Sequence, residues 1–168
     1  MSSGGEPVTG GVAERLAALG LSLPEPPPPI ANFVGAVTAG DLVFISGHGP
    51  YRDSEYRYLG KVDSEIAVDE AYQAARLTMI NLLATLQAEI GSLDRVVKVV
   101  KLFGMVNSDP TFKSQPQVIN GASDLLVELF GERGRHARSA VGMAGLPGGM
   151  SVEIEMIVQI RSPGVTSV

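Results

Sequence analysis

The stretch Ser151–Ile160, "SVEIEMIVQI", has the alternation that predicts the last β-strand of the chain. One side of this strand is entirely apolar, with every second residue contributing: Val152, Ile154, Met156, Val158 and Ile160. The other side carries Glu153 and Glu155. Two like charges two residues apart on one face repel each other, and covering them costs desolvation energy. Either this face is open to water, or one glutamate has a partner and a chemical role.

The rest of the chain alternates β-rich runs with two long helical patterns. Apolar residues at three- and four-residue spacing predict one helix that ends at Gly91 and a second over residues 115–130. Asp63 or Ser64 is expected to cap the first helix. β-branched and aromatic runs predict strands within residues 32–38, 42–47, 51–62, 95–106 and 137–145.

This order, close to βββαβαββ, predicts an α+β fold with one mostly antiparallel sheet and two helices on one face. The other face of the sheet then has no cover within the chain. We expect residues 137–145 and 151–160 to form a hairpin closed by "LPGG" at 146–149. In that register Arg138 can reach a pocket shared with Glu153. Periodicity alone describes the same pair as a surface ion pair of little energetic value.

The two ends of the chain have a different composition from the middle. We expect a flexible lead at residues 1–11, a short helix and a proline-rich arm at 12–31, and a tail at 164–168. Five prolines between Leu23 and Ile30 exclude a regular helix or a central strand, so the arm is extended. The arm is then a spacer or a strap over the domain, and a ligand for a proline-binding module is the alternative.

Composition narrows the classes of function. The 168 residues are 18% charged with a net charge of −5, which indicates a globular domain without a basic footprint for nucleic acid. The chain has no cysteine, no secretory signal and no apolar run long enough for a membrane span, so we expect a cytoplasmic protein. The low charge also leaves apolar surface of the kind that oligomers cover.

Few motifs carry chemistry on their own. His48 and His136 have no second ligand at metal spacing, so a structural or surface role is expected for each. The sequence contains no nucleophilic-serine motif, P-loop or dinucleotide glycine pattern. We therefore expect no metal and no cofactor, and Arg138 with Glu153 remains the constellation of interest.

Three blocks resemble the YjgF family, also called the Rid family of enamine and imine deaminases: "GDLVFISGHGP" (40–50), "INGASDLLVELFGERGRHARSAVG" (119–142) and "LPGGMSVEIE" (146–155). The most specific element is "ARS", whose Arg138 precedes Glu153 by fifteen residues. The resemblance runs from about Pro29 to Ile160 and assigns residues 32–163 to a Rid-like domain. The N-terminal arm and the second block are more similar to one uncharacterised branch of the family than to its well-studied deaminases.

The resemblance implies a chorismate-mutase-like fold and a homotrimer with ligand clefts between its subunits. It implies that Arg138 binds the carboxylate of a small metabolite. It also implies that Glu153 positions or activates the water that attacks an imine carbon, which releases ammonia and a 2-keto acid. Further cleft positions that match the family are Phe33, Ser46, Gly47, His48, Asn120 and Ala140.

Three of these positions depart from the family pattern. Phe33 stands where a tyrosine is usual and lacks its hydroxyl, while His48 replaces a glutamine and Ala140 a frequent cysteine. The expected function is hydrolytic deamination of enamines or imines derived from amino acids. A non-enzymatic trimer that binds metabolites in the same cleft is the alternative. The acidic charge disfavours the RNA cleavage attributed to some relatives, and a chorismate mutase activity rests on fold alone.

Overall fold

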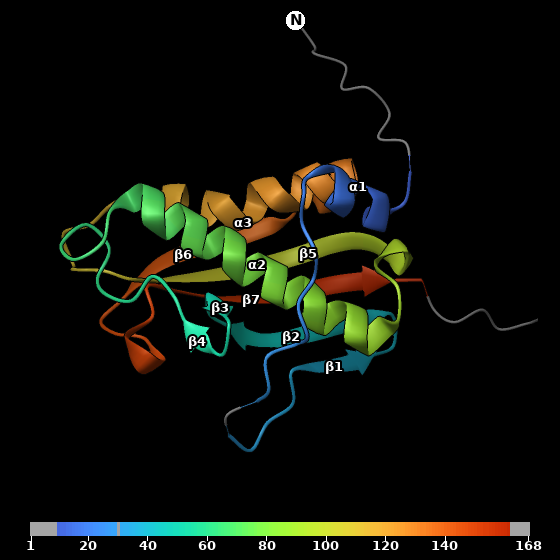
Figure 1. Ribbon diagram of the computed structural model, residues 1–168, viewed down its shortest axis with the longest axis horizontal. Helices are drawn as coiled ribbons and strands as arrows, with labels where there is room; N and C mark the ends of the chain where they lie inside the picture. The colour runs from blue at the N-terminus through green and yellow to red at the C-terminus, as the bar shows by residue number, and fades with distance from the viewer. Residues whose placement is uncertain (1–9, 30, 162–168) are drawn as a thin grey trace, which may run out of the picture.

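A computed structural model describes residues 10–29 and 31–161, and one five-stranded sheet forms its centre (Figure 1). Across the sheet the strands lie in the order β1 (Ala36–Ala39), β2 (Leu42–His48), β7 (Val152–Ile160), β5 (Val96–Asn107) and β6 (Ala137–Met143). Every neighbouring pair is antiparallel except β5 and β6, which are parallel. The predicted fold class is confirmed. Most of the expected lead (residues 1–9) and the expected tail (164–168) lie outside the described residues.

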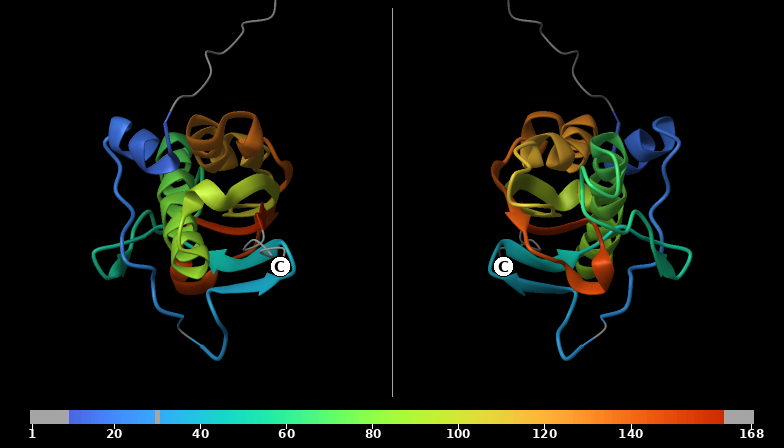
Figure 2. Two further views of the ribbon diagram at one scale, coloured as in Figure 1. Left: turned by 90° about the vertical axis from the view of Figure 1, so that its right-hand side faces the viewer. Right: turned by 90° about the vertical axis from the view of Figure 1, so that its left-hand side faces the viewer.

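Two long helices, α2 (Val68–Ile90) and α3 (Gln115–Phe130), cover one face of this sheet (Figure 2). The short helix α1 (Val12–Ala18) lies against α3. The alternation seen in the sequence of β7 decides which of its sides the helices bury, because all five of its apolar side chains are at most 4% exposed: Val152, Ile154, Met156, Val158 and Ile160. Burial of this stripe against α2 and α3 supplies much of the hydrophobic driving force of the fold.

The start of α2 differs from the prediction. Neither Asp63 nor Ser64 caps the helix, because Asp63 has a φ of +82° and belongs to a turn in which its N–H donates to Ile66 O at 2.8 Å. The helix begins only at Val68. The side chain of Glu70 accepts a hydrogen bond of 3.0 Å from the Ala67 N–H, so a residue inside the first turn satisfies this free donor.

The third short strand expected at the end of residues 51–62 does not join the main sheet, because Leu59 and Val62 form isolated bridges there. Residues 51–56 instead fold back on themselves as a separate hairpin of β3 (Tyr51–Arg52) and β4 (Glu55–Tyr56). Asp53 and Ser54 both have positive φ, at 54° and 63°, which is the backbone that a tight two-residue hairpin turn needs. Both edges of β7 are already paired, with β2 and with β5, so this segment has no central position to occupy.

The predicted hairpin of the last two strands does not form. β5 lies between β6 and β7 and pairs with both, because this 12-residue strand is long and rich in β-branched residues. Residues 146–151 therefore belong to a connection that crosses from β6 to β7. In this register Arg138 is aligned with Leu102 and Glu153 with Met105. Leu102 faces the helices, so Arg138 and Glu153 lie on opposite faces of the sheet.

The face of the sheet opposite the helices has no helical cover within the described ranges (Figure 2). Val37 is aligned with Phe44 on this face, and the two side chains are 52% and 43% exposed. Val97 and Val100 of β5 are exposed as well. An uncovered, partly apolar face agrees with the prediction and is the kind of surface that a further protein chain covers. None of the described helices combines the length and apolar character that crossing a membrane requires.

Candidate functional site

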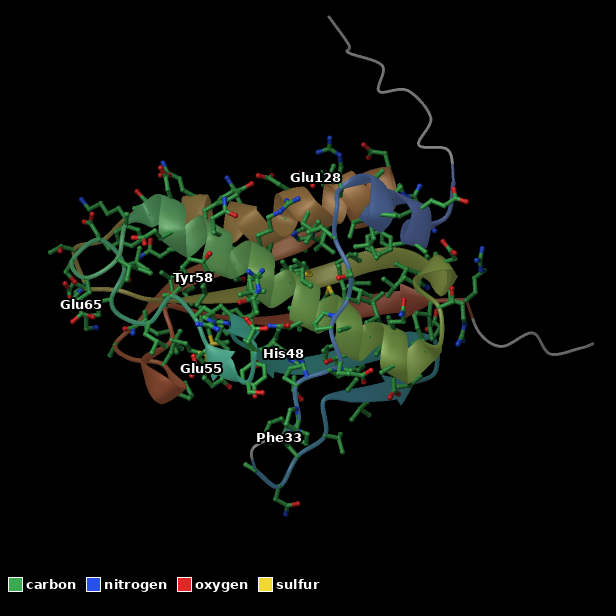
Figure 3. All side chains as sticks on the ribbon, viewed as in Figure 1. Phe33, His48, Glu55, Tyr58, Glu65 and Glu128 are labelled. Carbon is green, nitrogen blue, oxygen red and sulfur yellow. The ribbon has the colours of Figure 1, made fainter. Side chains whose placement is uncertain are left out.

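A cavity of about 240 Å³ opens beside the beginning of β7, and four of the predicted site residues line it: Phe33, Gly47, His48 and Glu153. They come from the loop before β1, from the end of β2 and from β7. Figure 3 shows Phe33 on that loop with His48 nearby at the end of β2. The fold therefore brings together residues that are up to 120 positions apart in the sequence (153 minus 33).

The carboxylate of Glu153 lies directly over Gly47. A Cβ at position 47 would overlap Glu153 Oε1, so only glycine allows this approach. A β-bulge between Ile45 and His48 adds one residue to β2 at this point and turns the strand around the carboxylate. Glu153 is half-buried, and burial raises its pKa above the usual value of 4.5, with a further contribution from the negative charge of Glu155. The result is a carboxylate with enhanced basicity beside open space.

His48 lines the cavity but has both ring nitrogens engaged by protein groups. Nδ1 lies 2.7 Å from the carbonyl oxygen of Ser46, to which it must donate. Nε2 then accepts from the Thr85 hydroxyl of α2 at 2.7 Å. The ring is only 7% exposed, and burial lowers the pKa of His48, which keeps it neutral at pH 7. These contacts connect the β2 bulge to the helix layer.

Ser46 does not line the cavity, and its contacts hold the loop that precedes β1. Its hydroxyl donates to Val34 O at 2.7 Å, and its backbone N–H donates to Gly35 O at 3.0 Å. Both acceptors lie within two residues of Phe33. The side chain of Ser46 therefore positions Phe33 at the cavity mouth.

The remaining predicted residues form a second group between β6 and α3. Arg138 Nη1 donates to Asn120 Oδ1 at 2.8 Å and to Ser123 Oγ at 3.0 Å, while Nη2 donates to Pro116 O at 3.4 Å. A guanidinium has five N–H donors, so two remain for a ligand beyond the three contacts made with described residues. Ala140, two positions further along β6, packs partly against the hydrophobic core.

The two groups do not meet within one chain. β5 separates their strands, which places β6 and β7 about 9–10 Å apart. The side chains of Arg138 and Glu153 also point to opposite faces of the sheet. Within one chain, the cavity with Glu153 and the hydrogen-bonded guanidinium of Arg138 are therefore separate sites.

Several residues near these groups were not predicted. Ser123 receives the Arg138 hydrogen bond and lies 3.0 Å from His136 Nε2, and its i, i+3 spacing from Asn120 on a predicted helix was an available signal. Tyr51, Tyr56, Met150 and three prolines of the arm (Pro27–Pro29) line the cavity. For Tyr51 and Tyr56, the turn residues Asp53 and Ser54 between them signalled a hairpin but gave no indication of its position.

Two further features of the structure help to delimit the site. A larger cavity of about 670 Å³ lies between the proline arm, the β3–β4 hairpin and α2, but none of the predicted site residues lines it. We assign the site to the smaller cavity because that one contains the basic carboxylate. Among the described residues, no three His, Asp or Glu side chains are grouped so that they could hold a metal ion.

Comparison with protein families identifies the family of the chain. The family model described as "YjgF/chorismate mutase-like, putative endoribonuclease" matches residues 13–152, which is most of the chain. The chain therefore belongs to the YjgF family, also called the Rid family.

Individual relatives agree with this assignment. Protein TCP17 of Trypanosoma cruzi is 42% identical over 92% of this chain and 97% of its own length. The 2-iminobutanoate/2-iminopropanoate deaminase of Dermatophagoides farinae is 32% identical over 84% of this chain and 95% of its own length.

Solved structures show the same fold. The protein Atu1372 of Agrobacterium tumefaciens, a protein of unknown function, superposes with a TM-score of 0.84 at 42% identity, covering 89% of this chain and 92% of its own. TdcF of Escherichia coli, whose crystal structure contains bound serine, gives a TM-score of 0.59 at 25% identity, over 82% of this chain and 94% of its own.

Proposed function

We propose that this protein is a hydrolytic deaminase of reactive enamines and imines derived from amino acids, and that it releases ammonia and a 2-keto acid. The observation that carries the proposal is the carboxylate of Glu153, held over Gly47 beside a cavity with a pKa raised by burial. A general base that works near neutral pH needs such a shift. The deaminase from D. farinae, at 32% identity, supports the reaction class.

The proposed reaction uses the two groups in different roles. Arg138 binds the substrate carboxylate with its unused N–H donors, a geometry that guanidinium suits. Glu153 removes a proton from a water molecule as its oxygen bonds to the imine carbon, and the C=N electron pair moves to nitrogen. The proton taken by Glu153 then passes to that nitrogen. The new hydroxyl group then gives its proton to the amine, with Glu153 as the carrier, and as the C–N bond breaks the carbonyl of the keto acid forms and ammonia leaves.

We further propose that each complete site lies between two copies of the chain in a homotrimer. Arg138 and Glu153 of one chain are on opposite faces of the sheet, so a second copy is needed to bring a guanidinium to the carboxylate cavity. The uncovered sheet face, with Val37 and Phe44 exposed, offers the apolar surface for such an assembly. The resemblance to the Rid family supports three copies.

Imine hydrolysis can be tested with an amino-acid oxidase that generates an imine in solution, with semicarbazide to trap what remains. We expect faster imine loss with the protein present. Arg138→Ala should lower kcat/KM by roughly 30- to 3,000-fold, because truncating one partner of a desolvated charge pair costs several kcal/mol. Arg135→Ala is the matched control, since Arg135 is exposed and paired with Glu132. No acceleration by the wild-type protein would contradict the proposal.

The role of Glu153 has its own test in the same assay. Glu153→Gln keeps the shape of the side chain but removes the base, so kcat should fall by roughly 10²- to 10⁴-fold. Glu155→Gln, an exposed position on the same strand, is the matched control and should retain most of the activity. Equal losses in the two variants would overturn the assignment of the base.

A non-enzymatic metabolite-binding role is the second candidate. It is favoured by Phe33, which brings no hydroxyl to the cavity, and by the serine bound in the E. coli TdcF structure. This candidate predicts binding of small 2-keto or amino acids that depends on Arg138, measured by calorimetry, together with no turnover of any imine.

A further inference from the structure

The cavity around Glu153 has walls that the reaction itself does not require. Three aromatic rings, those of Phe33, Tyr51 and Tyr56, line it together with Met150 and the prolines at 27–29. We refer to Phe33, Tyr51 and Tyr56 as the aromatic wall. Among the described lining residues Glu153 is the one carboxylate. A pocket lined mainly by aromatic and apolar side chains, with a few polar groups at its reacting end, suits an apolar substituent.

Two of the three rings are held in place from several sides. Tyr51 and Tyr56 are paired across the β3–β4 hairpin, with their ring centroids 5.4 Å apart in an edge-to-face arrangement. Asn81 of α2, which is only 1% exposed, donates to Gly49 O at 3.0 Å and to Tyr51 O at 2.9 Å. The hairpin is thus connected to the helix layer by a buried amide, and its rings form a fixed surface.

Tyr56 lies against Gly49, next to His48 at the end of β2. A Cβ at Gly49 would come within 3.0 Å of Tyr56 Cε1. Glycine at this position therefore allows the ring of Tyr56 to pack closely beside the end of β2, which carries His48. The negative charge of Glu153 contributes, after burial, to a raised pKa of the Tyr56 hydroxyl, as expected for two groups that share one cavity. Tyr56 therefore brings both an aromatic face and a hydroxyl to the space in front of Glu153.

The size of the cavity limits what it can enclose. A volume of about 240 Å³ corresponds to roughly eight water molecules at about 30 Å³ each. If the carboxylate of the substrate is held by Arg138 of another copy, this space is left for the imine carbon and its substituent. A benzyl group comes close to filling it and an isobutyl group occupies about half of it, whereas a methyl group leaves most of it empty.

We propose that the aromatic wall is a side-chain subsite that selects imines and enamines of amino acids with branched or aromatic side chains, with Tyr56 as its main specificity residue. This inference rests on the proposed function and adds a substrate class to it. The hairpin that carries Tyr51 and Tyr56 lies outside the strands that bear Arg138 and Glu153, so specificity and chemistry reside on separate elements.

The test compares imines generated from L-leucine and L-phenylalanine with the imine generated from L-alanine, using the whole wild-type protein. The large-to-small ratio of kcat/KM should be at least tenfold, because a pocket gains roughly 10- to 200-fold for one buried methylene. A ratio near one, or a preference for the alanine-derived imine, would overturn the inference while leaving deamination itself established.

Three variants locate the selectivity. Tyr56→Ala should reduce the large-to-small ratio by about tenfold, whereas Tyr56→Phe keeps the ring and should keep the ratio. Tyr72→Ala is the control, because Tyr72 is hydrogen-bonded to Asp124 on the helix layer and does not line the cavity. An unchanged ratio in Tyr56→Ala with a folded protein would contradict the assignment.

A binding measurement separates this inference from the proposed function. Calorimetry with 4-methyl-2-oxopentanoate and with pyruvate should show tighter binding of the larger keto acid by about tenfold or more. Tighter binding of the larger acid without turnover of any imine would remove the deaminase proposal and support the subsite. Equal binding of the two acids would count against the subsite whether or not imines are hydrolysed.

Discussion

The cavity around Glu153 and the cluster around Arg138 differ in how far one chain completes them. At Glu153 the chain supplies a basic carboxylate, a glycine that admits it, an aromatic wall and an enclosed volume. At Arg138 the chain supplies a guanidinium that is oriented by Asn120 and Ser123 of α3. The first region has a cavity that can hold a ligand, whereas the second has hydrogen-bond donors that can bind one.

The contrast indicates where the site is completed. Both regions carry part of the chemistry that the proposed reaction requires, yet the sheet separates them. Joining them inside one chain would require a change of strand pairing, which the buried stripe of β7 opposes. Joining them across two copies requires only that the edge strand β6 of one copy, with its Arg138, approaches the Glu153 cavity of another. We therefore expect the proposed site to be complete only when copies of the chain assemble.

Among variants that leave Arg138 and Glu153 themselves unchanged, the largest effect on this comparison is expected at Gly47. Gly47→Ala places a methyl group where Glu153 Oε1 lies, so the carboxylate has to move. A displacement of the base by about 1 Å lowers the rate by about 10²-fold. Gly145→Ala is the control, because a Cβ there meets nothing within 4 Å. If kcat/KM for imine hydrolysis is the same in both variants, the position of Glu153 is not critical.

A smaller effect is expected at the Arg138 cluster. Asn120→Ala removes the 2.8 Å hydrogen bond that orients the guanidinium but leaves its charge. KM should rise roughly three- to tenfold with little change in kcat, since one such bond contributes about 1 kcal/mol. Gln117→Ala, an exposed position on the same helix, is the control in steady-state kinetics. A large fall in kcat instead would place Asn120 next to the reacting atoms.

The smallest effect is a change in the pKa of Glu153, which can be measured by NMR on protein with a ¹³C-labelled glutamate carboxyl. Burial raises this pKa first and the charge of Glu155 raises it further, so Glu155→Gln should lower it. A guanidinium brought by a second copy favours the ionised form, so Arg138→Ala should raise the pKa. A pKa that responds to Glu155→Gln but not to Arg138→Ala would mean that no Arg138 reaches the cavity.

The sign of this shift also affects stability. The folded-state pKa of Glu153 lies above its usual value of 4.5, so ionisation opposes folding as the pH rises through the folded-state pKa. Glu153→Gln should therefore raise the melting temperature at pH 7, and the gain should disappear below about pH 4. A variant that is less stable than the wild type at pH 7 would contradict the stated environment of Glu153.

Local features of the fold could be predicted from the sequence, whereas pairings between distant strands could not. The helix at 115–130 and the buried stripe of β7 follow from spacing alone. The predicted hairpin of residues 137–145 with 151–160 was wrong because β5 pairs between these two strands. A turn sequence indicates a loop, but it does not show whether a third strand lies between the two strands that it joins. The cap at Asp63 or Ser64 was wrong because the positive φ of Asp63 is set by a turn.

The candidate site also contains residues that the sequence predicted and residues that it did not. Family resemblance on the "ARS" and "VEIE" motifs pointed to Arg138 and Glu153, and alternation located Glu153 on the side of β7 away from the core. Two rings of the aromatic wall, Tyr51 and Tyr56, were missed because they lie on a hairpin whose position depends on Asn81, thirty residues away in sequence from Tyr51 (81 minus 51). No periodicity in residues 51–56 signals that contact.

The most direct test of a site shared between copies is complementation of two inactive variants. Arg138→Ala and Glu153→Gln protein are unfolded together in equal amounts and refolded, and imine hydrolysis is compared with each variant refolded alone. Random assembly of trimers leaves one intact site in each mixed trimer, so about a quarter of the wild-type activity should return. If mixed trimers form, as mass spectrometry would show, and no activity returns, then Arg138 and Glu153 of different copies do not form one site.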